Sequence, residues 1–363
     1  MRFGVCVLVA AIALAAQPAR AADKAAAAFW KTVQARCDAA AAKPAGELGR
    51  KIAGVAIEEF NRFGGHRIDS DGRIFRFGLT EAEHEEDDGG NPQASLGHLG
   101  WWQVMKYWRT LYGGDPTDKL EVRGYRDAST LTDEAKVSEL LRTSAARLLK
   151  MADETSDPEQ REVLRETAMR AAAVDTSWSA AFVSYVVRQA GVGDNAFRFS
   201  NAHRSYIYDA FATSAGEMSN QNGDRIYRAC PLNTRPRVGD MICQQRESSL
   251  GDLSDEAVRE RIRTELAGGT DTRTIRRTHC EVVAHVDARA RKVYTIGGNV
   301  NQSVSARKMN LRGRGLKFAA SQKGQCGGPR QWTLPQPAIA GGVQPPAKCS
   351  LNDKKWFVLL QLR

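Results

Sequence analysis

The stretch WSAAFVSYVVRQAG, from Trp178 to Gly191, predicts an α-helix that is apolar on nearly every side. Asp175, Thr176 and Ser177 precede it as candidate N-caps, and Gly191 is a stop signal. A helix with so little polar surface has to be buried against other elements. Its packing partners are expected among the segments that follow it.

Those segments alternate between apolar and polar residues as β-strands do. The predicted strands are Val238–Cys243, His279–Val286, Lys292–Ile296, Val300–Ala306 and Trp356–Leu360, with a helical insertion at Ser254–Leu266. Helices are predicted upstream over residues 24–41, 47–60, 101–112, 133–151 and 157–173, whereas residues 66–98 are expected to form an irregular surface stretch. Helices followed by strands indicate an α+β fold class.

The first 21 residues have the pattern of a secretory signal peptide. Arg2 is followed by the uncharged run Phe3–Ala16 and then by the small-residue triplet Ala19-Arg20-Ala21, so cleavage is expected after Ala21. An uncleaved amphipathic anchor is the less favoured alternative, because the run is apolar on all sides. We expect a periplasmic or secreted protein with no transmembrane segment, since no later apolar run approaches the ~20 residues of a membrane span.

The remaining chain is expected to contain an Ala-rich helix and linker (residues 22–46), a helical N-terminal part (47–173) and an α+β core with a basic end (174–363). It keeps six cysteines, namely Cys37, Cys230, Cys243, Cys280, Cys326 and Cys349. In an oxidising compartment this even count indicates up to three disulfides, and neighbouring strands favour Cys243 with Cys280. No pair has C-x-x-C spacing, which disfavours a metal role for the cysteines.

Positive charge is concentrated at the C-terminal end. Residues 273–363 hold 17 Lys or Arg against three acids, and the chain after Ala21 has 50 basic and 42 acidic residues. Such a field attracts anionic envelope polymers such as peptidoglycan, or lipid head groups, although a basic surface that only maintains solubility is equally compatible. No motif indicates a nucleic-acid partner or a nucleotide, flavin or metal cofactor.

Ser179 and His279 suggest a hydrolase site. Ser179 lies in the first turn of the apolar helix, where free N–H groups favour developing negative charge. Strand alternation places His279 and Glu281 on one face and Cys280 on the other, so a Cys280–His279 dyad is disfavoured. The structural alternative, a helix-start serine and a histidine that only packs, is more common for such residues.

Several motifs in order carry a resemblance to a known family. They are Trp178–Val186, Phe197–Ile207, Val238–Asp240, His279–Val283 and Ile296–Val300. Together they resemble the bacterial family known as domain of unknown function 2272, over roughly residues 48–310. That family looks like a distant relative of papain-like cell-wall hydrolases of the CHAP and NlpC types, so the resemblance implies a papain-like α+β fold.

The resemblance also implies roles for individual residues. Ser179 stands where the catalytic cysteine of the papain-like enzymes stands, His279 matches their histidine, and Asn299 matches the polar residue that orients it. Glu281 and His203 are reserve candidates. A serine cannot be stored as an anion beside an imidazolium as a thiolate can, so Ser179 needs a base that removes its proton during attack.

Three functions are compatible with these residues. The first is an exported peptidoglycan hydrolase, of amidase or endopeptidase type, that uses Ser179 with His279 and Asn299. The second is an inactive envelope-binding protein that keeps a papain-like groove. The third is an acyl hydrolase on another substrate, including a secreted effector.

Overall fold

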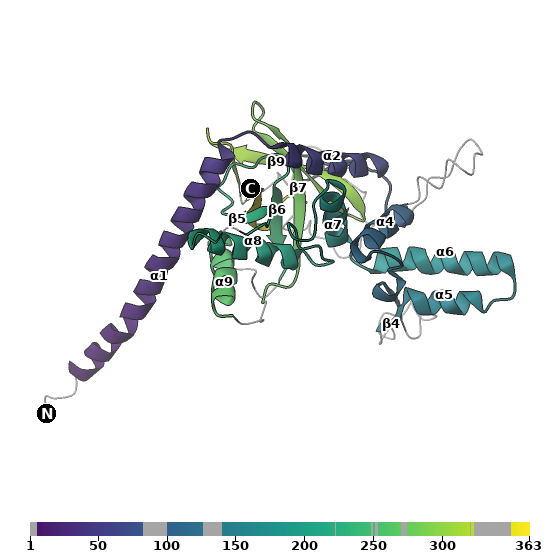
Figure 1. Cartoon of the computed structure of the whole chain (residues 1–363), viewed down its shortest axis with the longest axis horizontal. Helices are drawn as coiled ribbons and strands as arrows, with labels where there is room; N and C mark the ends of the chain where they lie inside the picture. Colours follow the sequence, from purple (N-terminus) through teal and green to yellow (C-terminus); the bar gives the residue numbers. More distant parts are fainter. Residues whose placement is uncertain are drawn as a thin grey trace, which may run out of the picture.

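The computed structural model describes residues 6–82, 100–125, 140–221, 223–247, 250, 253–269, 274–319, 321–322 and 350–363. These residues form eight α-helices and a mixed β-sheet, so the α+β class is confirmed. Figure 1 shows a central body around the sheet, a long N-terminal helix that extends away from it, and a helical hairpin that projects from the opposite side.

The sheet has the strand order β2-β1-β9-β8-β7-β6-β11-β5, and β10 adds to β9. Its strands are β1 (His66–Ile68), β2 (Ile74–Arg76), β5 (Tyr227–Cys230), β6 (Met241–Gln245), β7 (Thr278–Asp287), β8 (Lys292–Val300), β9 (Ser303–Arg312), β10 (Lys317–Phe318) and β11 (Lys355–Leu362). β1 runs parallel to β9 and the other pairings are antiparallel. A separate hairpin pairs β3 (Glu121–Tyr125) with β4 (Leu140–Ser144).

The helices are α1 (Cys6–Ala41), α2 (Glu47–Arg62), α4 (Gly100–Tyr112), α5 (Ala145–Asp153), α6 (Pro158–Asp175), α7 (Ser179–Gln189), α8 (His203–Met218) and α9 (Asp255–Ala267), with a 3-10 turn at Thr117–Lys119. The apolar helix α7 packs on β7 and β8 and is covered by α4 and α2. Phe182 and Val183 of α7 are fully buried in the main core. The expected burial of this helix is therefore confirmed.

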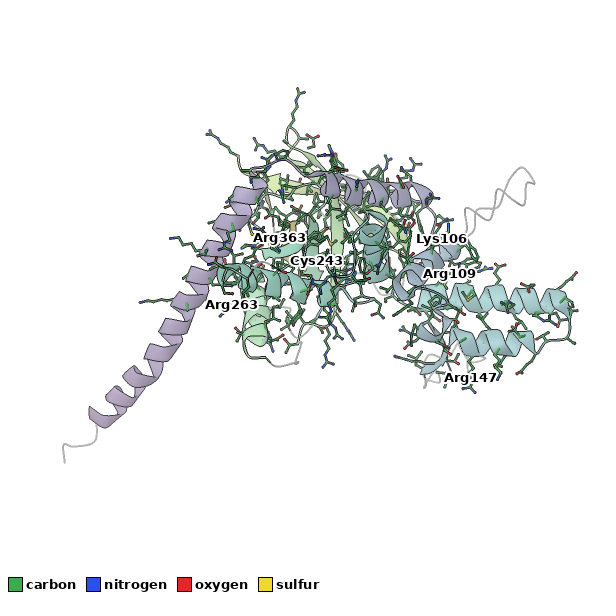
Figure 2. The ribbon with its side chains drawn as sticks, in the orientation of Figure 1. Lys106, Arg109, Arg147, Cys243, Arg263 and Arg363 are labelled. Atoms are coloured by element: carbon green, nitrogen blue, oxygen red, sulfur yellow. A yellow bond between two sulfur atoms is a disulfide. The ribbon has the colours of Figure 1, made fainter. Side chains whose placement is uncertain are left out.

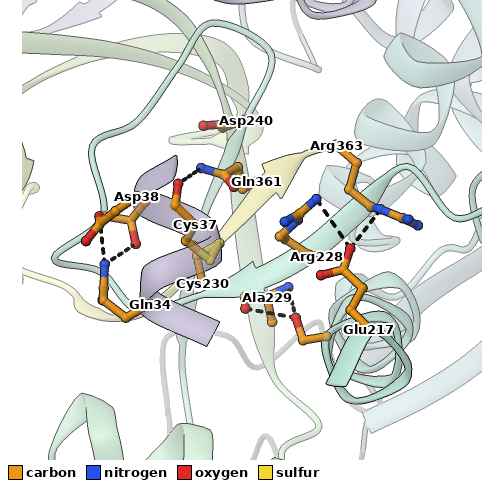
Figure 3. Close-up of a disulfide and its surroundings, with 12 residues drawn as sticks. Gln34, Cys37, Asp38, Glu217, Arg228, Ala229, Cys230, Asp240, Gln361 and Arg363 are labelled. Carbon is orange, nitrogen blue, oxygen red and sulfur yellow. Dashed lines mark hydrogen bonds and ion pairs between the residues drawn. A yellow bond between two sulfur atoms is a disulfide. The ribbon is translucent and has the colours of Figure 1, made fainter. Parts of the chain in front are cut away.

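Two disulfides lie within the described residues. Cys243–Cys280 joins the neighbouring strands β6 and β7, as expected from the sequence, and Cys37–Cys230 joins α1 to β5 (Figure 3). Figure 2 shows Cys243 in the central body and Arg147 on the projecting helical hairpin. Both bridges fit an oxidising, extracytoplasmic compartment. Cys326 and Cys349 lie outside the described residues.

Helix α1 includes the expected signal sequence and continues into the helix predicted over residues 24–41. Beyond the expected cleavage point it is attached by the Cys37 bridge and by a hydrogen bond from Gln361 Nε2 to the Cys37 carbonyl (2.9 Å; Figure 3). Cleavage after Ala21 stays a prediction. Of the helices in the described ranges, none combines the length and apolar character that crossing a membrane requires.

Two predicted segments need correction. Residues 66–98 contain the short strands β1 and β2, which were missed because three residues are too few for an alternation pattern. The helix predicted over residues 133–151 begins only at Ala145, after strand β4. The missed signal is Ser144, whose hydroxyl accepts a hydrogen bond from the Arg147 amide and caps the helix (3.3 Å).

Candidate functional site

Ser179 is the first residue of α7 and is 9 % exposed. The helix start is held tightly against β8, because a Cβ on Gly298 would lie 2.5 Å from Phe182 and 2.7 Å from Trp178. Only a glycine permits this approach. The local sequence thus fixes the hydroxyl of Ser179 at the junction of the helix and the sheet.

The hydroxyl of Ser179 forms a hydrogen bond with an imidazole, and that imidazole belongs to His203. The Ser179 Oγ to His203 Nε2 distance is 2.7 Å, and His203 is 4 % exposed at the start of α8. Its other ring nitrogen, Nδ1, contacts the hydroxyl of Tyr206 and accepts a hydrogen bond from the backbone amide of Cys280 (3.3 Å). Every ring nitrogen of His203 therefore has a partner.

The backbone contact decides which nitrogen of His203 carries the proton. An amide N–H can only donate, so Nδ1 has to be an acceptor. The pKa of His203 is well below its usual value because burial, the neighbouring His279 and the charge of Arg246 all disfavour the imidazolium. We therefore assign the proton of the neutral ring to Nε2, which makes His203 the donor to Ser179 and Oγ the acceptor.

The expected Ser179–His279 hydrogen bond is replaced by this Ser179–His203 pair. Alternation along β7 places Cys280 in the core cluster that contains Phe182, and His279 on the other face with Glu281. His279 is fully buried and its ring lies 5.0 Å from that of His203, edge to face. Its ring nitrogens form no hydrogen bond with Ser179, and its ring contacts that of His203 instead.

His279 contacts Glu281 without a hydrogen bond. Nε2 lies 3.4 Å from Glu281 Oε1, but neither ring nitrogen has a partner in hydrogen-bond geometry among the described residues. Burial lowers the pKa of His279, against the opposing effect of Glu281. Asn299, the expected orienting residue, does not hold this ring; it is half-buried and lines a cavity with Arg246.

Glu281 is ionised and fully paired. Burial alone would raise its pKa, but Arg307 and His279 lower it to about 2. Arg307 Nε donates to both carboxylate oxygens (3.1 and 3.2 Å), and Thr295 donates to Oε2 (2.5 Å). Its charge is thereby used to hold Arg307, which makes Glu281 a poor candidate for a base.

Sequence reasoning missed Glu81 at the same helix start. It was assigned to an exposed stretch, whereas it is 2 % exposed and accepts a hydrogen bond from Trp178 Nε1 (2.5 Å). Burial raises its pKa to about 7 despite that hydrogen bond. Nothing in the local sequence separates this buried acid from the other acids between residues 81 and 88.

In the described parts of the chain, no group of three or more His, Cys, Asp or Glu has the geometry to hold a metal ion.

Comparison with protein families identifies the chain from its sequence. A family model described as an uncharacterised protein conserved in bacteria (DUF2272) matches residues 97–362. The chain belongs to the DUF2272 family. Comparison with curated proteins gave no match, and comparison with solved structures gave none either. The family match covers α7, the strands β5–β11 and every residue of the site except Glu81.

Proposed function

We propose that this DUF2272 protein is an exported envelope protein of papain-like fold that binds an anionic wall polymer such as peptidoglycan without cutting it. One observation carries the proposal. Ser179 Oγ lies 2.7 Å from His203 Nε2, and the Cys280 amide donates to Nδ1, from which we infer that the ring donates from Nε2 to the Ser179 hydroxyl.

That tautomer has the wrong direction for nucleophilic catalysis. A serine attacks only when a base takes its proton, so the imidazole nitrogen that faces Oγ has to be unprotonated. Here that nitrogen carries the proton. Moving it to Nδ1 would set two N–H groups, of His203 and Cys280, against each other in a buried site. The surroundings of Ser179 therefore support a structural hydrogen bond.

Export and the class of ligand have separate support. The N-terminal pattern is that of a secretory signal peptide, and the two disulfides fit an oxidising compartment. The excess of 14 positive charges in residues 273–363 favours an anionic partner over a neutral one.

The test uses the chain from residue 22 and purified sacculi. We expect the sacculi to retain the protein while their muropeptide profile, measured by chromatography, stays unchanged. Release of soluble muropeptides by the wild type, lost in Ser179→Ala and retained in the exposed control Ser219→Ala, would overturn the proposal.

A second candidate is the exported hydrolase itself, because Oγ lies 2.7 Å from an imidazole at a helix N-terminus. In this case the base is His203, and His279 and Asn299 have supporting roles. The muropeptide assay separates the two candidates, since only the hydrolase loses an activity when His203 is replaced by glutamine.

A further inference from the structure

A cavity of about 280 Å³ is lined by residues from the ends of β6 and β8, from β9, and from the start of β11 and the segment before it. Four basic residues and four amide residues contribute to its lining: Arg246, Arg307, Lys354, Lys355, Gln244, Gln245, Asn299 and Asn301. We call these eight residues the cationic recess. It adjoins the candidate site through the strand pairing, because Gln244 of β6 pairs with His279 of β7.

Three of the cations, Arg246, Lys354 and Lys355, form no salt bridge among the described residues. Asp353 is the acid in the lining, and Glu281 behind it is already paired with Arg307. The recess therefore has a local excess of positive charge that the fold does not neutralise.

Arg307 is held rigidly at the base of the recess. It is 3 % exposed, donates through Nε to Glu281, and donates through Nη1 to the Leu351 carbonyl (2.5 Å) and to Asn352 Oδ1 (3.0 Å). Arg246 and Lys355, in contrast, are exposed to solvent. One fixed cation with accessible cations around it is the arrangement that binds an oxyanion.

The cations also disfavour one another. Burial lowers the pKa of Lys354, and Arg307 and Arg246 lower it further. Arg246 is exposed over part of its side chain, and partial desolvation of the rest lowers its pKa, as does Arg307, against the attraction of Glu281. An anion in the recess would relieve this repulsion, so charge and cavity point to the same class of ligand.

We propose that the cationic recess binds an oxyanion, a carboxylate or phosphate group of the envelope polymer. The identity of the polymer rests on the function proposed above, whereas the oxyanion site rests on the cavity and its unpaired cations. The amides of Gln244 and Asn299 line the same cavity and can supply further hydrogen-bond donors.

The test is an NMR titration of the chain from residue 22 with inorganic phosphate and, separately, acetate, at constant ionic strength set with chloride. In the wild type we expect saturable shifts of the backbone amide signals of Asn299 and Lys354. In Arg246→Gln/Lys354→Gln the affinity should fall by about tenfold or more, since two charge-assisted contacts are lost.

The matched control is Arg289→Gln/Lys317→Gln, which removes the same charges from exposed positions outside the recess. It should keep the wild-type affinity. Absence of saturable shifts in the wild type, or equal affinity in both double variants, would overturn the oxyanion site. An unchanged NMR spectrum away from the recess shows that a variant is folded. If Arg246→Gln/Lys354→Gln does not fold, the milder variant Lys355→Gln takes its place.

Two further measurements separate the sources and the two proposals. A dipeptide with a free C-terminal carboxylate, compared with its amide, identifies a peptide carboxylate, whereas stronger binding of inorganic phosphate identifies a phosphate. Sacculi that retain Arg246→Gln/Lys354→Gln as well as wild type would leave the envelope function standing and overturn the recess as its site. Phosphate binding without retention on sacculi would leave the oxyanion site standing and overturn the envelope function.

Discussion

Replacing Ser179 by alanine tests the hydrogen bond on which the functional argument depends. The change removes the acceptor 2.7 Å from His203 Nε2 and leaves a buried N–H group without a partner. Water cannot readily replace the hydroxyl, since His203 is 4 % exposed and Ser179 is 9 % exposed. A buried donor without an acceptor costs about 1–3 kcal/mol, so we expect Ser179→Ala to lower the free energy of unfolding by that amount.

The ring cannot avoid this cost by moving its proton. Shifting it to Nδ1 would satisfy the Tyr206 hydroxyl but oppose the Cys280 amide, which donates to the same nitrogen. One buried N–H group stays unpaired in either tautomer. The loss is therefore expected whichever form the variant adopts.

The assay is urea unfolding at 25 °C followed by tryptophan fluorescence, with equal m-values as the condition for comparing midpoints. Ser219→Ala is the control, because the Ser219 hydroxyl is exposed and its loss should change the stability by less than about 0.5 kcal/mol. Equal stability of the two variants would refute the reasoning, since it would mean that water reaches His203 or that the bond is absent in solution.

Three other predictions follow from buried groups and bridges. Because the pKa of His203 is well below its usual value, nitrogen-15 NMR should give a neutral ring protonated on Nε2 at neutral pH; a proton on Nδ1 would favour the hydrolase instead. The folded state favours the neutral form of Glu81, because burial raises its pKa from 4.5 to about 7. The free energy of unfolding that Glu81 contributes is therefore lost as pH rises from 4.5 through about 7. Unfolding measured against pH should therefore show Glu81→Gln gaining up to about 1.4 kcal/mol per pH unit relative to wild type over that range, and parallel curves would contradict this. Replacing both Cys37 and Cys230 by alanine should cost about 2–5 kcal/mol and make residues 22–41 sensitive to limited proteolysis, whereas resistance like that of the wild type would mean that packing alone holds α1.

Sequence patterns predicted the core of this fold because its elements are long. The apolar helix α7 and strand β7 each extend over at least ten residues, and their predicted bounds lie within two residues of the observed ones. The strand predicted over Val300–Ala306 overlaps β9 only from Ser303 and includes the turn that follows β8. Strands of three or four residues, such as β1 and β5, are stabilised by pairing with distant segments and leave no pattern of their own. Their prediction would require knowledge of the whole sheet.

The candidate site was predictable in part. The position of Ser179 follows from the helix pattern, and the opposite faces of His279 and Cys280 follow from strand alternation. The choice of His203 as the partner of Ser179 does not. The position of the His203 ring is set by the Cys280 amide, which donates to it. Cys280 lies beyond Val282–Ile296, the last pair between β7 and β8, so the choice of His203 depends on where this strand pairing ends.

Burial explains why a serine, and not a thiolate, suits this helix start. A papain-like cysteine is activated by an imidazolium stored beside it, which requires a histidine that holds a proton near neutral pH. Here burial lowers the pKa of both His203 and His279, and the positive charge of Arg246 lowers each of them further. A thiolate at position 179 would therefore lack its stabilising cation, whereas a neutral hydroxyl that accepts one hydrogen bond needs none. The residue at position 179 and the electrostatics around it thus agree with each other, and both support the proposal that Ser179 is not a nucleophile.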